Sequence, residues 1–176
     1  MKKVMLLHGW NGSNLPHWQG WLAQELSNRN IAVAFVQLSD YDYPKKDIWI
    51  KEAHEAINDF KPDTVICHSL GNILWFHLCA LEIPEVKNLL LVAPTRDLSD
   101  YKELKTFFPV TIPTSLKAKE SLMITSNNDP YLNPLEAKEL QKKLQIEHIE
   151  LKNAGHINSD SNYGKWDWVL DWTLSS

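Results

Sequence analysis

Short aliphatic runs alternate along this chain with stretches whose apolar residues recur at helical spacing, and this alternation constrains the fold more than any other feature. The aliphatic runs predict β-strands, several of them buried on both faces, at residues 3–7, 31–38, 64–67, 89–92, 121–125 and 146–151. The helical stretches cover residues 18–26, 49–60, 70–81, 135–144 and 166–173. Such alternation predicts an α/β fold: a sheet of about six mainly parallel strands with helices on both faces, in a three-layer sandwich.

One segment interrupts the alternation. Residues 94–118 have no clean period, and they contain three prolines and the pair Phe107-Phe108. A segment of this length without regular structure is usually a lid or a binding loop. Because the chain has 176 residues and no repeat or linker, we expect a single domain over residues 1–176 with residues 94–118 as a short insertion.

Charge and composition exclude several classes of protein. The 18 basic and 22 acidic side chains give a net charge of −4, which argues against nucleic acid as the main partner. The apolar run at residues 4–7 is too short for a signal peptide, and no run is long enough to cross a membrane. Cys67 and Cys79 lie among apolar residues, which favours a reducing compartment, and we expect a cytoplasmic protein. No histidine pair has metal-ligand spacing, so we expect neither a metal nor a cofactor.

The residues just beyond the carboxyl ends of parallel strands are the ones to examine for chemistry. The segment Cys67-His68-Ser69-Leu70-Gly71 ends the third predicted strand and opens a helix. A strand, tight turn and helix in this order form a nucleophile elbow, which aims a serine hydroxyl near the free N–H groups of the helix. Gly71 fits the usual pattern, whereas Cys67 stands where that pattern has glycine. We therefore predict Ser69 as the nucleophile.

Two further strand ends carry an acid and a base. Asp129 follows the fifth predicted strand, and His156 follows the sixth. An isolated aspartate in a turn is usually only a turn former. Three suitable residues at three strand ends, in the order Ser, Asp, His, match the triads of α/β-hydrolases. We therefore predict Ser69, Asp129 and His156 as a catalytic triad.

The loop at residues 8–13, after the first predicted strand, is a candidate for the oxyanion site. In this fold that loop supplies one backbone N–H, and the residue after the nucleophile supplies the other. The backbone amides of Trp10 and Leu70 are then the predicted donors. A plain glycine-containing turn explains the loop residues equally well by themselves.

At this point the sequence resembles a known family: the small, nearly cap-less α/β-hydrolases called retinoblastoma-binding-protein-nine-like or YdeN-like serine hydrolases. The resemblance covers essentially the whole chain. Its carriers are Leu7-His8-Gly9-Trp10, His17-Trp18-Gln19, His68-Ser69-Leu70-Gly71, Leu91-Val92-Ala93-Pro94, Asn128-Asp129-Pro130-Tyr131 and Gly155-His156-Ile157-Asn158. The resemblance implies the strand order 2-1-3-4-5-6 and the same triad.

Two other residues compete for the catalytic roles. Cys67 is a thiol beside His68, but the last residue of a buried strand points into packing, and we expect His68 to pack or hydrogen-bond beside the elbow. Asp97 follows the fourth predicted strand, where some α/β-hydrolases place their acid. The position of Asp129 after the fifth strand, together with the resemblance, favours Asp129.

The predicted function is hydrolysis of small acyl esters, thioesters or amides through an acyl-enzyme. A short insertion at 94–118 in place of a cap predicts a shallow pocket, walled by Trp10 and covered by Phe107 and Phe108. The alternative is a catalytically weak protein-interaction module on the same fold. The sequence identifies no protein partner, and a Leu-x-Cys-x-Glu motif is absent around Cys79.

Overall fold

The computed structural model describes residues 2–176 and contains a six-stranded sheet in which every neighbouring pair is parallel. The strands are β1 (Lys3–Leu7), β2 (Ala32–Phe35), β3 (Thr64–His68), β4 (Val86–Val92), β5 (Ala118–Ser126) and β6 (Glu147–Leu151). Their order across the sheet is β2-β1-β3-β4-β5-β6. The α/β fold and the strand order expected from the sequence are confirmed.

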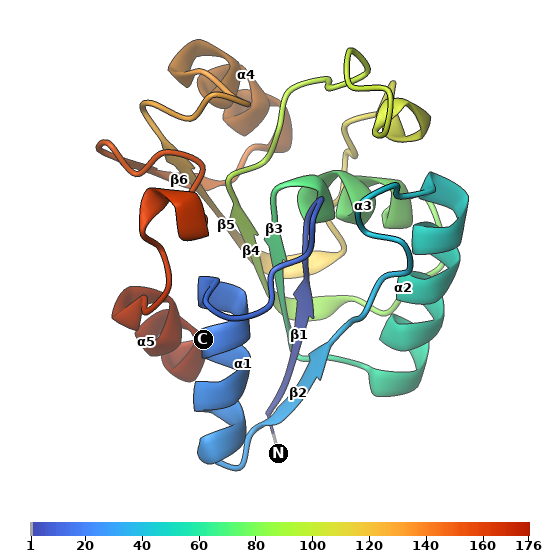
Figure 1. The fold of residues 1–176 in the computed structure, drawn as a ribbon. Helices are drawn as coiled ribbons and strands as arrows, with labels where there is room; N and C mark the ends of the chain where they lie inside the picture. The colour runs from blue at the N-terminus through green and yellow to red at the C-terminus, as the bar shows by residue number, and fades with distance from the viewer. Residues whose placement is uncertain (1) are drawn as a thin grey trace.

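Five α-helices cover the two faces of the sheet (Figure 1). They are α1 (Trp18–Asn28), α2 (Lys46–Phe60), α3 (Leu70–Leu78), α4 (Pro134–Leu144) and α5 (Asp167–Ser175). The buried side chains of α1 and α5 share one apolar layer, and those of α2, α3 and α4 share the other. The molecule therefore has the helix–sheet–helix layering that a buried parallel sheet requires.

Side chains of the central strands alternate between these two layers. In β3, Val65 and Cys67 face α2 and α3, whereas Ile66 between them faces α1 and α5. All three side chains are fully buried. Because both faces of the strand are covered, β3 is apolar almost throughout, as the sequence pattern indicated.

Three strands differ by more than one residue from the bounds expected from the sequence. β4 and β5 begin earlier, because Val86 and Ala118 already pair at the amino end of the sheet. The polar residues at the start of β5 hid this extension. β2 ends earlier, at Phe35, and all four of its residues are only half-buried, as is common for a strand at the sheet edge.

The segment 94–118 begins on the carboxyl-end side of the sheet, at the top of Figure 1, and returns to the amino end, where Ala118 begins β5. Its only regular element is the short 3-10 helix η1 (Lys105–Phe107). Among the helices of residues 2–176, none combines the length and the apolar character needed to cross a membrane.

Candidate active site

Ser69 occupies a sharp turn between β3 and α3. Its backbone has φ of 54° and ψ of −124°, an uncommon conformation for a residue with a side chain. The turn is fastened to the neighbouring strand: the Ser69 amide donates to the Val92 carbonyl at 3.1 Å, and Asn72 Nδ2 donates to the carbonyls of Ser69 and Val92. The structure therefore has the strand–turn–helix geometry expected of a nucleophile elbow.

Two glycines allow the elbow to approach the loop after β1. A Cβ on Gly71 would lie 2.5 Å from the Leu7 carbonyl oxygen, which is backbone and cannot yield. A Cβ on Gly9 would lie 2.7 Å from Ser69 Cβ. Hydrogen in place of a side chain at these two positions brings the loop and Ser69 into contact.

Cys67 fits at the position where the elbow pattern has glycine, because its side chain points into the apolar layer beneath α2 and α3. Burial raises the pKa of the Cys67 thiol well above its ordinary value. A buried thiol that resists ionisation is a poor nucleophile. The structure therefore favours Ser69 over Cys67 at this strand end.

His156 connects Ser69 to Asp129. His156 Nε2 lies 2.8 Å from Ser69 Oγ, and His156 Nδ1 lies 2.9 Å and 3.0 Å from the two carboxylate oxygens of Asp129. His156 and Asp129 are 7% and 6% exposed, so this chain of hydrogen bonds is largely shielded from water. Nδ1–H can then donate to Asp129 while Nε2 accepts from the serine hydroxyl.

Two polar side chains, Ser126 at the end of β5 and Asn128 just after it, hold the loop after β6 in place. Ser126 Oγ accepts from the Ala154 amide at 2.9 Å, and Asn128 Oδ1 accepts from the Gly155 amide at 2.8 Å. These contacts join the loops that carry Asp129 and His156. They explain how an acid and a base 27 residues apart come to within hydrogen-bonding distance.

Asp97, the other aspartate considered as the acid, does not contact His156. Its side chain is exposed, and its carboxylate accepts from the Ser99 amide at 2.8 Å within a local turn. Of the two aspartates considered from the sequence, the structure brings only Asp129 to His156.

The amides of Trp10 and Leu70 are free to bind an oxyanion. Leu70 is the first residue of α3, where a backbone N–H has no partner within the helix. Within residues 2–176, neither amide donates a hydrogen bond. Gly9 is adjacent to both, since a Cβ placed on it would lie 3.2 Å from the Leu70 nitrogen.

A cavity of about 120 Å³, here called the Ser69 cavity, opens beside the serine. Its lining consists of Trp10, Asn11, Ser69, Leu70, Leu98, Leu104, Tyr131, His156, Asn158 and Asp160. Trp10, which the sequence suggested as a wall of the acyl site, is among these lining residues. Tyr131 packs edge-on against the imidazole of His156, with 4.6 Å between ring centroids.

The expectation that Phe107 and Phe108 cover the cavity is not met. Phe107 is fully buried and packs against Trp49, with ring centroids 5.4 Å apart, so it belongs to the core. Phe108 is half-buried on the same apolar layer and is not part of the cavity lining. The insertion reaches the cavity instead through Leu98 and Leu104, which sequence reasoning missed.

Known proteins resemble this chain in sequence and in fold. The family model described as "Serine hydrolase" matches residues 4–173. This chain belongs to the serine hydrolase family. The hydrolase is 24% identical to YdeN of Bacillus subtilis over 181 residues, which cover 97% of this chain and 93% of YdeN. The resemblance to YdeN-like serine hydrolases is therefore confirmed.

Solved structures share the fold of this hydrolase. The crystal structure of the Bacillus subtilis ydeN gene product superposes with a TM-score of 0.87 at 20% identity, over 99% of this chain and 98% of that one. An esterase domain from Rhodothermus marinus gives a TM-score of 0.66 at 16% identity, over 97% of this chain and 85% of that one. A monoacylglycerol lipase from Paleococcus ferrophilus gives 0.65 at 14% identity, over 98% and 94%.

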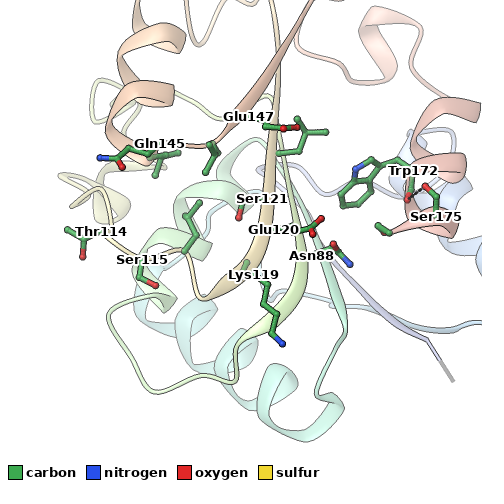
Figure 2. A pocket seen from close by; sticks show the side chains of 16 residues that line it. Asn88, Thr114, Ser115, Lys119, Glu120, Ser121, Gln145, Glu147, Trp172 and Ser175 are labelled. Carbon is green, nitrogen blue, oxygen red and sulfur yellow. Dashed lines mark hydrogen bonds between the residues drawn. The ribbon is translucent and has the colours of Figure 1, made fainter.

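A larger groove of about 720 Å³ lies at the other end of the hydrolase (Figure 2). We call it the amino-end groove, because it is lined by Asn88 of β4, residues 114–116, the beginnings of β5 and β6, and the ends of α4 and α5. Lys119, Glu120 and Glu147 in its lining are all exposed. Among residues 2–176, no histidine or cysteine lines this groove, and no cluster of metal-ligating side chains is found.

Proposed function

We propose that this hydrolase cleaves small acyl esters, thioesters or amides with Ser69, His156 and Asp129 as its catalytic triad. The observation that carries the proposal is the hydrogen-bonded chain from Ser69 Oγ through both ring nitrogens of His156 to Asp129, with contacts of 2.8 Å and 2.9 Å. Catalytic triads are recognised by this geometry and not by sequence position.

The reaction has two halves. Ser69 Oγ attacks the substrate carbonyl carbon while His156 Nε2 takes the hydroxyl proton. The resulting oxyanion is held by the Trp10 and Leu70 amides, each worth about 3–4 kcal/mol if well placed. His156 then gives its proton to the leaving group, which leaves an acyl group on Ser69. In the second half, water attacks the acyl carbon while His156 Nε2 takes a proton from it. His156 then returns this proton to Ser69 Oγ, and the carboxylic acid is released.

The Ser69 cavity supports small acyl groups. Its volume of about 120 Å³ is well below the roughly 300 Å³ at which ordinary ligand pockets begin. Leu98 and Leu104 of the 94–118 insertion are buried and form part of its wall. We propose that this insertion takes the place of a cap within a single domain, and that it limits the length of the acyl chain.

We propose the cytoplasm as the location, with no protein partner assigned. Cys67 and Cys79 are free thiols, as a reducing compartment allows. Burial raises the pKa of Cys79 to about 12, so this thiol also resists ionisation.

The test is labelling with a fluorophosphonate probe, which reacts with activated serines and requires no knowledge of the substrate. We expect the probe to attach to Ser69 of the wild-type protein, as located by peptide mass spectrometry. Ser69→Ala should lose the label, whereas Ser121→Ala, which changes a serine of the amino-end groove, should keep it. Labelling of a folded Ser69→Ala protein at the wild-type rate would refute the proposal.

A further inference from the structure

Backbone conformation around His156 requires support from its surroundings. The chain reaches this residue through Gly155, with φ of 54°, and leaves it through Ile157, with φ of 50°. A positive φ is a genuine outlier for a β-branched residue and persists only where neighbouring structure holds it. The side chain of Ile157 is fully buried. Groups that bind this stretch of backbone therefore decide where the imidazole lies.

Two buried aromatic rings bind successive carbonyls of this stretch. Trp18 Nε1–H, from the first turn of α1, donates to the Ile157 carbonyl at 2.8 Å. His68 Nε2 lies 3.0 Å from the His156 carbonyl oxygen. Because a carbonyl can only accept, His68 carries its proton on Nε2 and donates. We call Trp18 and His68 the ring clamp.

The ring clamp is itself fixed by the start of α1. His17 Nδ1 accepts from the Gln19 amide at 3.1 Å and so caps the helix that carries Trp18. The His17 ring also packs edge-on against His68, with 4.7 Å between centroids. Burial lowers the pKa of His68 well below its usual range, and the nearby rings of His17 and His156 act in the same direction. His68 is consequently a neutral donor.

We propose that Trp18 and His68 are positioning residues that hold His156 where it reaches both Ser69 and Asp129. His68 precedes Ser69 in the chain and binds the backbone of His156, so one ring connects the nucleophile to the base. The inference rests on the proposed roles of Ser69 and His156. It assigns a purpose to the segment His17-Trp18-Gln19, which forms no part of the Ser69 cavity.

Steady-state kinetics on two variants test the ring clamp. Trp18→Phe and His68→Met each remove one N–H donor and fill the space with an apolar side chain. We expect kcat to fall about 10- to 100-fold, since a displacement of about 1 Å can cost on the order of 100-fold. We expect KM to stay within about twofold, because the substrate contacts are unchanged. His68→Gln keeps an N–H donor and should recover most of the lost kcat.

Trp75→Phe is the matched control. Trp75 lies on α3, the helix that follows Ser69, and is also fully buried, but its Nε1–H donates at 3.0 Å to the carbonyl of Leu116 in the amino-end groove and not to the loop of His156. This variant should lower the melting temperature about as much as Trp18→Phe and leave kcat unchanged. Equal kcat losses in Trp75→Phe and the clamp variants, or wild-type kcat in Trp18→Phe and His68→Met, would overturn the inference.

A proton NMR measurement separates this inference from the proposed function. The His156 Nδ1–H resonance, shifted downfield by its bond to Asp129, reports the position of the ring without any turnover. If wild-type activity proves independent of Ser69, the proposed function fails, and the NMR signal still decides the clamp. Loss of the resonance in folded Trp18→Phe, with retention in Trp75→Phe, supports the ring clamp; retention in both overturns it.

Discussion

The two ends of the sheet each carry a hollow, and the larger hollow is not the one that lies beside the candidate catalytic residues. At the amino end lies a groove of about 720 Å³ whose charged side chains are all exposed. At the carboxyl end lies a cavity of only about 120 Å³, and beside it Ser69, His156 and Asp129 form one hydrogen-bonded chain. Catalysis depends on buried polar groups fixed in advance around a reacting atom. The smaller space is therefore the better candidate for chemistry.

Residues with positive φ also differ between the two ends of the sheet. Near the amino end, Lys61 and Gln145 have positive φ, but each simply ends a helix in the αL conformation. Near the carboxyl end, positive φ occurs at Ser69 and at Ile157, a β-branched residue beside the base. Unusual backbone at helix ends is routine, whereas unusual backbone at a reacting group indicates a conformation kept for function.

The largest expected effect on turnover distinguishes two serines at opposite ends of the sheet, Ser69 and Ser121. Ser69→Ala should lower turnover of a short activated ester by on the order of 10⁶-fold, as the loss of a triad nucleophile does. Ser121→Ala in the amino-end groove should leave turnover unchanged. Rates are compared at equal folded fraction, checked by circular dichroism. Loss of turnover in Ser121→Ala alone would reverse our assignment of the two ends.

The next largest effect on turnover distinguishes two aspartates at the carboxyl end of the sheet, Asp129 and Asp97. Asp129→Asn should lower turnover about 10⁴-fold, because an amide favours the wrong tautomer of His156. Asp97→Asn should cost at most about 1–2 kcal/mol of the free energy of unfolding, through its turn hydrogen bond to the Ser99 amide. Wild-type turnover in Asp129→Asn would exclude it as the acid.

The comparison of the two aspartates shows what sequence can predict here. Asp129 and His156 follow strands that the apolar runs had located, and parallel strands bring their carboxyl ends to one edge, so their proximity was predictable. The elbow at Ser69 was predictable for the same reason, since strand, turn and helix are local signals.

The insertion shows where sequence reasoning ends. Phe107 is apolar and lies in an irregular segment, and nothing in its local pattern distinguishes a core residue from a cavity wall. The path of the segment in the fold determines which residues reach the cavity: Phe107 packs against Trp49 in the core, and Leu104 lines the cavity.

A smaller effect tests whether the Ser69 cavity limits the acyl chain. Leu104→Ala removes part of its wall and should shift the preference toward longer acyl esters. Each added methylene that becomes buried is worth about 0.8 kcal/mol, or roughly fourfold in kcat/KM. Leu116→Ala is the matched change in the amino-end groove, where Leu116 is also buried. The measurement is kcat/KM for acetyl to hexanoyl esters, and an equal shift in both variants would contradict the assignment.

The smallest effect on activity comes from His17, whose influence falls on the pH dependence of stability. Burial, reinforced by the nearby rings of His156 and His8, lowers the pKa of His17 to about 3. An unfolded histidine titrates near about 6.5, so below that pH the unfolded chain binds a proton that the folded chain refuses. The stability contributed by neutral His17 is therefore complete above about pH 6.5 and is lost progressively as the pH falls toward 3.

His17→Asn removes this titration and retains a side chain able to cap α1. Between pH 7 and 5 the wild-type protein should lose about 2 kcal/mol more of its free energy of unfolding than the variant does, measured by urea denaturation. His148→Asn is the control: burial also lowers the pKa of His148, but this residue on β6 is only half-buried, so its removal should change the pH dependence less. Turnover of folded His17→Asn at pH 7 should fall less than in the clamp variants, since asparagine retains the cap of the helix that carries Trp18 and only the ring contact with His68 is lost. If the free energies of wild type and His17→Asn fall in parallel, His17 takes up a proton without unfolding. The His17 ring would then be able to carry a charge in the folded protein, and a neutral His17 packed against His68 would not be required at the carboxyl end of the sheet.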